Sequence, residues 1–304
     1  DGESIEADLV VDAGGRGSKT PSWLRELGFE APFEEKVEVQ LSYTTRIFKR
    51  HDQQLGKDKV VVIAPTPSGK RGGVIIAQEN GRWMVTLFGH FGITAPVDLK
   101  GFIDFAKTLP SPDIYDLLRE AEPVDDACTI RYPASTRRRY EKLSMFPEGF
   151  LVFGDAICSF NPIYGQGMTV AAMQAIALQD ALVATDRGLA KRFFKKASRI
   201  IDNPWKIAVG ADLRMPETPG RRSLATRFIN RYIAEVHKCA HTDRRTARAF
   251  VRVAQLLEEP SSLMRPRILL RVLSASAREL LRDKDRPVSR RVVARSTSST
   301  QANS

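Results

Sequence analysis

Residues 154–168, GDAICSFNPIYGQGM, decide how this chain can fold. They lie between an apolar strand predicted over 150–153 and an Ala-rich helix predicted over 168–184. A strand that ends in Gly154-Asp155 places the carboxylate at a carboxyl-terminal sheet edge, where open α/β sheets bind ligands. Gly165 and Gly167 let the backbone approach a flat ligand closely and adopt positive φ without strain. The stretch therefore predicts a strand, a ligand-binding turn and a helix in succession.

The chemistry of this turn indicates a flavin. The Asp155 carboxylate can accept hydrogen bonds from the hydroxyls of a sugar-like chain. The helix predicted from Met168 begins with unpaired N–H groups and the positive end of its dipole. A reduced flavin is negative near N1 and the C2 oxygen, and a helix N-terminus stabilises such a charge. Gly-Asp alone is an ordinary turn, but Pro162, two glycines and a helix in register favour a site.

A second motif supports the first. Residues 7–18, ADLVVDAGGRGS, form an apolar strand that runs into a Gly-rich turn made by Gly14, Gly15 and Arg16, with Ser18 after it. By itself this motif fits a plain turn as well as a site. It gains its weight from the pairing with Gly154-Asp155.

Together the motifs resemble the two flavin fingerprints of FAD-dependent monooxygenases of the aromatic-hydroxylase type (group A flavoproteins). The resemblance runs from about residue 7 to at least residue 182. It implies that Asp155 binds the ribityl hydroxyls of FAD, and that the isoalloxazine edge is lined by Pro162, Gly165, Gln166, Gly167 and Met168. It also assigns cofactor contacts to Gly14, Gly15 and Arg16. The chain departs from the family at Gly14, where an Asp is usual, which weakens the bearing of this turn on NAD(P)H.

The dinucleotide loop of such a protein is absent from the sequence. Nothing before Ala7 supplies the G-x-G-x-x-G turn and the later acidic residue that hold the adenosine half of a dinucleotide. We therefore expect this chain to be the carboxyl-terminal part of a longer flavoprotein, with the pyrophosphate loop upstream.

Between the motifs the sequence predicts a sheet. Strands are indicated at 37–48, 60–64, 74–77 and 82–88, followed by a helical segment over 100–120 and a strand near 128–132. The predicted fold class is α/β: a partial FAD-binding Rossmann-like domain, an inserted antiparallel β-sheet substrate domain and an α-helical C-terminal region. The expected boundaries are 1–30 and 146–186 for the FAD-binding domain, 31–145 for the substrate domain, 187–295 for the helical region and 296–304 for a disordered tail.

Charge divides the chain. Residues 187–304 carry a net charge of +17, whereas residues 1–186 carry −6. The basic part is patterned as helices, at 224–236, 243–257 and 268–281, with Asp243 as a plausible N-cap, so we expect packed amphipathic helices and no nucleic-acid partner. Peripheral contact of this region with an anionic membrane stays open.

Composition indicates a mixed, soluble chain in a reducing, cytoplasmic setting. The 304 residues are 42% apolar, without an uninterrupted run of 18 apolar residues. The three cysteines lie far apart without metal-ligand spacing, so no metal is expected, and Cys158 is interpreted as a small buried thiol.

The remaining polar candidates are less decisive. Arg137, Arg138 and Arg139 could clamp an anion, but a solvated charge cluster is favoured. His90 fits a proton donor at a substrate cavity and a hydrogen-bonded strand end equally well. Tyr43 and Trp83 are expected in the core or a cavity wall. No catalytic side chain is identified.

The predicted function is an FAD-dependent oxidoreductase, most simply an NAD(P)H-dependent monooxygenase. In that chemistry O2 and the reduced flavin form a C4a-hydroperoxide that hydroxylates or epoxidises an apolar or aromatic small molecule. One alternative is a flavin-dependent reductase of isoprenoid double bonds. Another is a flavoprotein remnant that acts as a non-catalytic binding module. A halogenase is disfavoured because Trp23, Trp83 and Trp205 form no Trp-x-Trp motif.

Overall fold

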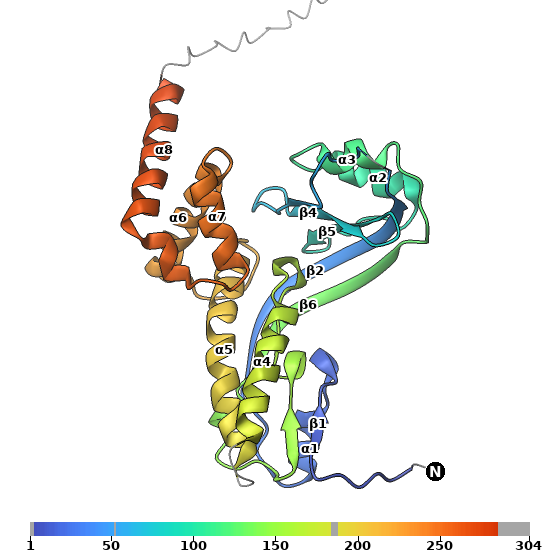
Figure 1. The fold of residues 1–304 in the computed structure, drawn as a ribbon, viewed down its shortest axis with the longest axis vertical. Coiled ribbons are helices and arrows are strands. Elements are labelled where there is room, and N and C mark those ends of the chain that lie inside the picture. The colour runs from blue at the N-terminus through green and yellow to red at the C-terminus, as the bar shows by residue number, and fades with distance from the viewer. Residues whose placement is uncertain (1–2, 52, 184–187, 285–304) are drawn as a thin grey trace, which may run out of the picture.

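A computed structural model describes residues 3–51, 53–183 and 188–284, with side chains described as far as residue 278. The chain has three parts: a parallel strand pair with flanking helices, a curled antiparallel sheet, and a group of C-terminal helices (Figure 1). The long strands β2 (Glu34–Lys49) and β6 (Cys128–Arg138) connect the first two parts.

The parallel pair consists of β1 (Val10–Asp12) and β7 (Phe150–Val152), aligned so that Asp12 lies opposite Val152. Each strand runs into a short 3-10 turn, η1 (Gly15–Gly17) or η3 (Gly154–Ala156). Helix α1 (Thr20–Glu26) follows the first turn. The second leads through β8 (Cys158–Ser159) and η4 (Pro162–Tyr164) into α4 (Gly167–Leu182). The strand, turn and helix predicted around residues 154–168 are confirmed.

The antiparallel sheet has six strands in the order β3-β4-β5-β2-β6-β8. It includes β3 (Val60–Ile63), β4 (Arg71–Gln78) and β5 (Arg82–His90), so every predicted strand is present. Buried and less buried residues alternate along much of β2, because successive side chains of a strand point to opposite faces of the sheet. One face packs against α2 (Leu99–Lys107) and α3 (Asp113–Leu118) in a core centred on Phe48, Ile75, Trp83, Val85 and Phe102.

The predicted helical segment over 100–120 is two helices, not one. Helix α2 is capped by Asp98, whose Oδ1 accepts a hydrogen bond from Gly101 N at 2.7 Å. Pro110 and Pro112 follow its end, and proline cannot continue a helix that needs its N–H. The chain therefore breaks over 108–112 before α3 begins.

The C-terminal helices are α5 (Leu189–Asp212), α6 (Leu224–Ala240), α7 (Arg244–Ala254), η5 (Pro260–Met264) and α8 (Pro266–Lys284). Helix α5 lies beside α4 and buries Phe193, Phe194, Ala197 and Ile201 in the same core as β7 (Figure 1). Asp243 caps α7, as predicted, by accepting a hydrogen bond from Thr246 N at 3.2 Å.

The prediction that the helix over 224–236 is packed along its apolar face is wrong for its first half. Tyr232 and Val236 join a small core with Val272 of α8. Phe228, one turn before Tyr232, and Leu224, two turns before it, are exposed, because no other described element covers that end of α6. The predicted disordered tail over 296–304 lies outside the described residues.

Candidate functional site

The two sequence motifs meet at one edge of the parallel pair. Because β1 and β7 run in the same direction and are in register, the turns that follow them lie side by side, with η1 in contact with η3. Residues of η1 and η3, far apart in the sequence, thus form one surface.

Arg138 joins the two turns. Its Nη1 donates to the carbonyl of Ala156 at 2.9 Å and its Nη2 donates to the carbonyl of Arg16 at 3.2 Å. Its Nε donates to Glu34 Oε1 at 2.8 Å, which balances the buried charge. The sequence does not show this role, because three consecutive arginines give no indication of which one points inward.

Asp12 organises the first turn and was not among the predicted site residues. Its Oδ1 accepts from Gly14 N at 2.8 Å, and its Oδ2 accepts from the hydroxyls of Ser18 and Thr20. Desolvation raises the pKa of this carboxyl, but the hydrogen bonds outweigh it and the pKa lies below its usual value. A Cβ on Gly14 would lie 2.9 Å from Asp12 Oδ1, so the Asp12 carboxylate explains why this chain has glycine there. Hydroxyls six and eight residues after a strand-end Asp are the signal that sequence reasoning missed.

Asp155 lies in η3, and its side chain borders the first residue of α4. A Cβ on Gly167, the first residue of that helix, would lie 3.7 Å from Asp155 Oδ1. Desolvation raises the pKa of Asp155, while the charge of Arg16 and a hydrogen bond with Ser159 oppose the rise. The Arg16 guanidinium lies over the Tyr132 ring, 5.2 Å from its centroid, and donates to the carbonyl of Arg131 at 3.2 Å. The positive charge of Arg16 thus acts on the Asp155 carboxylate from the neighbouring turn.

Three glycines of these turns have positive φ. Gly15, Gly154 and Gly165 have φ values of +70°, +65° and +65°, and a Cβ built on any of them meets no atom within 4 Å. Gly15 is half-buried and Gly165 is exposed, so a flat ligand could approach the backbone at these two positions, whereas Gly154 is buried. The expectation of positive φ holds for Gly165 but is wrong for Gly167, which lies in the first turn of α4 and has no positive φ.

The other predicted contacts point in different directions. Met168 is 88% exposed, and Pro162 and Gly165 are also exposed. Gln166 is only 3% exposed, and its Nε2 donates to the carbonyl of Ala254 at the end of α7. The Gln166 side chain thus faces the C-terminal helices, so only its backbone remains for the predicted ligand edge.

Asp212, at the end of α5, accepts hydrogen bonds from the turn that precedes α4. Its Oδ1 accepts from Tyr164 Oη at 2.7 Å and from Asn161 Nδ2 at 2.8 Å, while Oδ2 is buried without a hydrogen-bond partner. Burial raises the pKa of Asp212 to about 6. Nothing in the sequence marked this residue, because its partners lie about fifty positions away.

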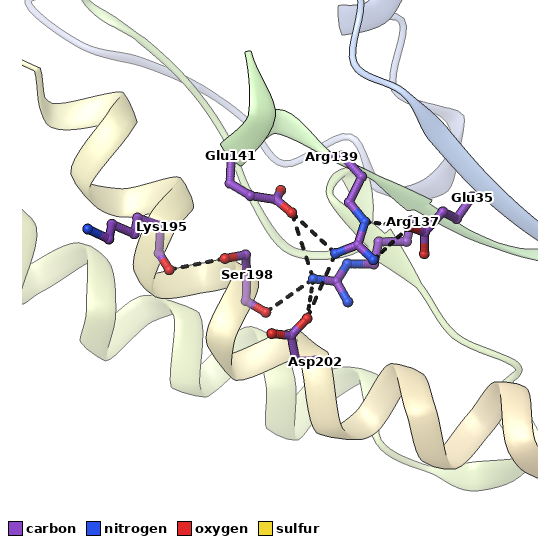
Figure 2. Close-up of polar contacts among 7 residues, drawn as sticks. All are labelled: Glu35, Arg137, Arg139, Glu141, Lys195, Ser198 and Asp202. Atoms are coloured by element: carbon purple, nitrogen blue, oxygen red, sulfur yellow. Dashed lines mark hydrogen bonds and ion pairs between the residues drawn. The ribbon is translucent and has the colours of Figure 1, made fainter. Parts of the chain in front are cut away.

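The interpretation of Arg137–Arg139 as a solvated cluster is wrong. Arg137 has a side chain only 2% exposed, and its Nη2 lies 2.7 Å from Asp202 Oδ1 on α5 and 3.2 Å from the carbonyl of Ser198. Arg139 pairs with Glu35 at 2.6 Å and with Glu141 at 3.2 Å (Figure 2). Acidic side chains from β2, η2 and α5 neutralise the arginines, so the alternative of a free anion clamp is not supported either.

The remaining candidates are buried. His90 Nδ1 donates to the carbonyl of Val39 at 3.0 Å, which fits a hydrogen-bonded strand end, and its Nε2 has no partner among the described residues. Burial lowers the pKa of His90, so its neutral form is favoured. Trp83 lies in the sheet core as expected, and Tyr43 packs at a smaller cluster. Cys158 is a buried free thiol, as expected, and burial raises its pKa.

An apolar cavity of about 540 Å3 lies between β1 and α4, lined by Val11, Phe153, Leu178 and Leu182 among others. None of the nine predicted cofactor contacts lines it. Within the described ranges, no cluster of three or more His, Cys, Asp or Glu side chains could hold a metal ion. No helix among these residues is long and apolar enough to cross a membrane.

Comparison with known proteins places this geometry in a fold. No protein-family model matches the chain. Protein Rv3254 of Mycobacterium tuberculosis is 37% identical over 187 residues, which cover 62% of this chain and 39% of that protein. A flavoprotein/dehydrogenase from Cytophaga hutchinsonii aligns with a TM-score of 0.55 at 15% identity, covering 91% of this chain and 62% of the other. A Klebsiella pneumoniae HpxO variant complexed with FAD aligns with a TM-score of 0.52 at 17% identity, covering 70% and 53%.

These similarities establish the fold. The chain shares its fold with these two solved flavoproteins, which confirms the predicted fold class of mixed α/β with a curled antiparallel sheet and a helical C-terminal region. The chain spans less than two thirds of the length of each of these relatives.

Proposed function

We propose that this chain forms the ribityl- and isoalloxazine-binding part of an FAD-dependent oxidoreductase. The observation that carries the proposal is the contact between the two turns, with Asp155 beside the first residue of α4. The HpxO structure, which has this fold, is complexed with FAD.

The residues present fit a flavin. Asp155 would accept hydrogen bonds from ribityl hydroxyls, and desolvation already raises the pKa of this carboxyl in the chain itself. The N-terminus of α4, at Gly167, would stabilise negative charge on the isoalloxazine edge. The backbone at Gly15 and Gly165 would allow close approach of the ring and the chain that carries it. Gly14 and Arg16 would complete the contacts from the first turn.

The bound flavin would supply redox chemistry, in the proposed reaction a monooxygenation that uses NAD(P)H and O2 on an apolar or aromatic small molecule. The chain's part is to bind, orient and exclude water. The inward face of the antiparallel sheet, with Val39, Leu41, Phe88 and Tyr132, would form an apolar wall next to Arg16. A cytoplasmic location is part of this proposal.

The first prediction concerns Asp155. The substitution Asp155→Ala removes a charge-assisted hydrogen bond worth about 1.5 to 3 kcal/mol, so the affinity for FMN should fall about 10- to 100-fold. Titration of the chain with FMN, followed by flavin fluorescence, measures the change. Asp58→Ala, an exposed carboxylate in the loop before β3, is the control and should bind as the unaltered chain does.

Equal affinity for FMN in the Asp155→Ala and unaltered chains would contradict the proposed site. In the whole protein, labelled molecular oxygen should enter the product. Double-bond reduction without oxygen incorporation would favour the isoprenoid reductase instead.

A further inference from the structure

A second cavity, of about 580 Å3, opens among the C-terminal helices, between α7, η5 and the start of α8. Five arginines line it: Arg245, Arg248 and Arg252 from α7, and Arg265 and Arg267 from the segment where α8 begins. We call it the arginine cavity. None of the predicted flavin contacts lines it, so it is separate from the site described above.

The sequence places the α7 arginines on one face of the helix. Arg245, Arg248 and Arg252 are spaced three and four residues apart, which brings their side chains to the same side. Like charges at this spacing repel each other and destabilise the helix unless something neutralises them. Such an arrangement therefore favours an anionic partner.

The chain supplies little of that neutralisation. Among the described residues that line the arginine cavity, only Glu258 carries a carboxylate. It is engaged by Arg252 Nε at 2.7 Å and by Arg265 Nη1 at 3.4 Å. No hydrogen bond or ion pair to the side chains of Arg245, Arg248 or Arg267 is present within the described part of the chain. Three guanidinium groups thus remain uncompensated around one cavity.

Two neutral features of the wall also suit an anion. Ser262 is only 5% exposed and lines the cavity; its Oγ lies near Glu258 but has no hydrogen bond of good geometry among the described residues. This hydroxyl can donate to the Glu258 carboxylate or to an oxyanion bound in the cavity. Helix α8 begins at Pro266, on the cavity wall, and directs the positive end of its dipole there.

We propose that the arginine cavity binds phosphate groups, in the form of a phosphate monoester or a diphosphate. Guanidinium groups bind phosphate oxygens through paired hydrogen bonds, and several of them around one cavity select for multiple negative charge. The phosphate can come from a soluble organic phosphate or from a phospholipid headgroup, since the recognising chemistry is the same. The proposal is independent of flavin binding.

Calorimetric titration with inorganic pyrophosphate tests the site at physiological ionic strength, with sodium chloride matched in the reference. Arg248→Gln should weaken binding about tenfold, because one charge-assisted contact is lost. Arg244→Gln removes the same charge from the same helix but outside the cavity, so its binding should equal that of the unaltered chain. Arg248 is exposed and unpaired, so its replacement should not unfold the chain, which circular dichroism verifies.

A second arm distinguishes the source of the phosphate. Sedimentation with phosphatidylcholine vesicles that contain phosphatidic acid should show Arg248-dependent binding, and not Arg244-dependent binding, if a lipid headgroup is the ligand. Pyrophosphate binding without vesicle binding indicates a soluble phosphate. Equal losses for Arg248→Gln and Arg244→Gln would reduce both effects to general electrostatic attraction and overturn the proposal, as would the absence of binding in both arms.

Discussion

Asp212 shows how a single buried carboxylate can couple the candidate flavin site to the C-terminal helices. It receives hydrogen bonds from Tyr164 and Asn161, which belong to the turn before α4, although Asp212 itself ends α5. Its second oxygen has no partner. A buried carboxylate with an unpaired oxygen is costly to ionise, so burial raises its pKa to about 6.

This pKa predicts how stability depends on pH. Because the pKa of Asp212 is higher in the folded chain than its ordinary value of 3.8, the folded state holds the proton more tightly. The contribution of Asp212 to stability is therefore full below pH of about 4 and is lost as the pH rises to about 6, a change of about 3 kcal/mol. Asp212→Asn, which keeps an acceptor for Tyr164, should remove this dependence.

Urea unfolding at several pH values measures the difference between the two chains. Asp180→Asn removes a carboxylate that is exposed on α4 and pairs with Lys196 in the described part of the chain; it is the control and should leave the pH profile unchanged. Parallel profiles for the Asp212→Asn and unaltered chains would show that folding does not raise the pKa of Asp212, contrary to the prediction.

At the scale of elements, Arg137 ties β6 to α5. Its guanidinium reaches Asp202 and the carbonyl of Ser198 on α5, while Glu141 lies 3.9 Å away in η2 (Figure 2). Helix α5 in turn packs on α4, whose first residue borders Asp155. The ion pair thus fixes the helix that supports the site.

Arg137→Leu should destabilise the chain by about 2 to 3 kcal/mol, less than the loss of a fully buried pair because Asp202 is half exposed. Guanidinium chloride unfolding of the two chains measures the loss. Lys195→Met removes a positive charge from the exposed side of the same helix and should change the stability by less than about 0.5 kcal/mol. A similar loss in both variants would assign the effect to overall charge.

Some elements could be predicted and others could not, for physical reasons. Alternating burial made β2 and β5 readable, and the cap at Asp243 marked the start of α7. The glycines and Asp155 were singled out because a ligand-facing turn would need those residue types, and the structure brings Asp155 beside Gly167. Arg138 and Asp212 were missed, because their roles depend on partners that only the fold brings near.

The exposed end of α6 was also beyond the sequence. Leu224 and Phe228 follow the spacing of a buried face, and periodicity alone shows only that a face is apolar, not that another element covers it. The same limit applies to Arg137–Arg139. Three consecutive charged residues indicated side chains exposed to solvent, whereas in the folded chain acidic side chains pair with them.

For the molecule as a whole, the proposed site would supply contacts to only one half of a dinucleotide. In that proposal Asp155, the N-terminus of α4 and the glycines of the turns would contact the ribityl chain and the ring. The sequence contains no G-x-G-x-x-G turn to hold a pyrophosphate, and that loop provides much of the affinity of dinucleotide sites. The adenosine half of FAD should therefore add little to binding by this chain.

The expected outcome is that the chain binds FAD and FMN with dissociation constants within about tenfold of each other, both weak enough that flavin is lost on purification. Parallel fluorescence titrations give the two constants, and Asp155→Ala should weaken both ligands by the same factor because it acts on the part they share. If FAD binds about a hundredfold more tightly than FMN, the chain holds the adenosine half through residues outside the two motifs. A yellow protein that keeps FAD through gel filtration would lead to the same conclusion.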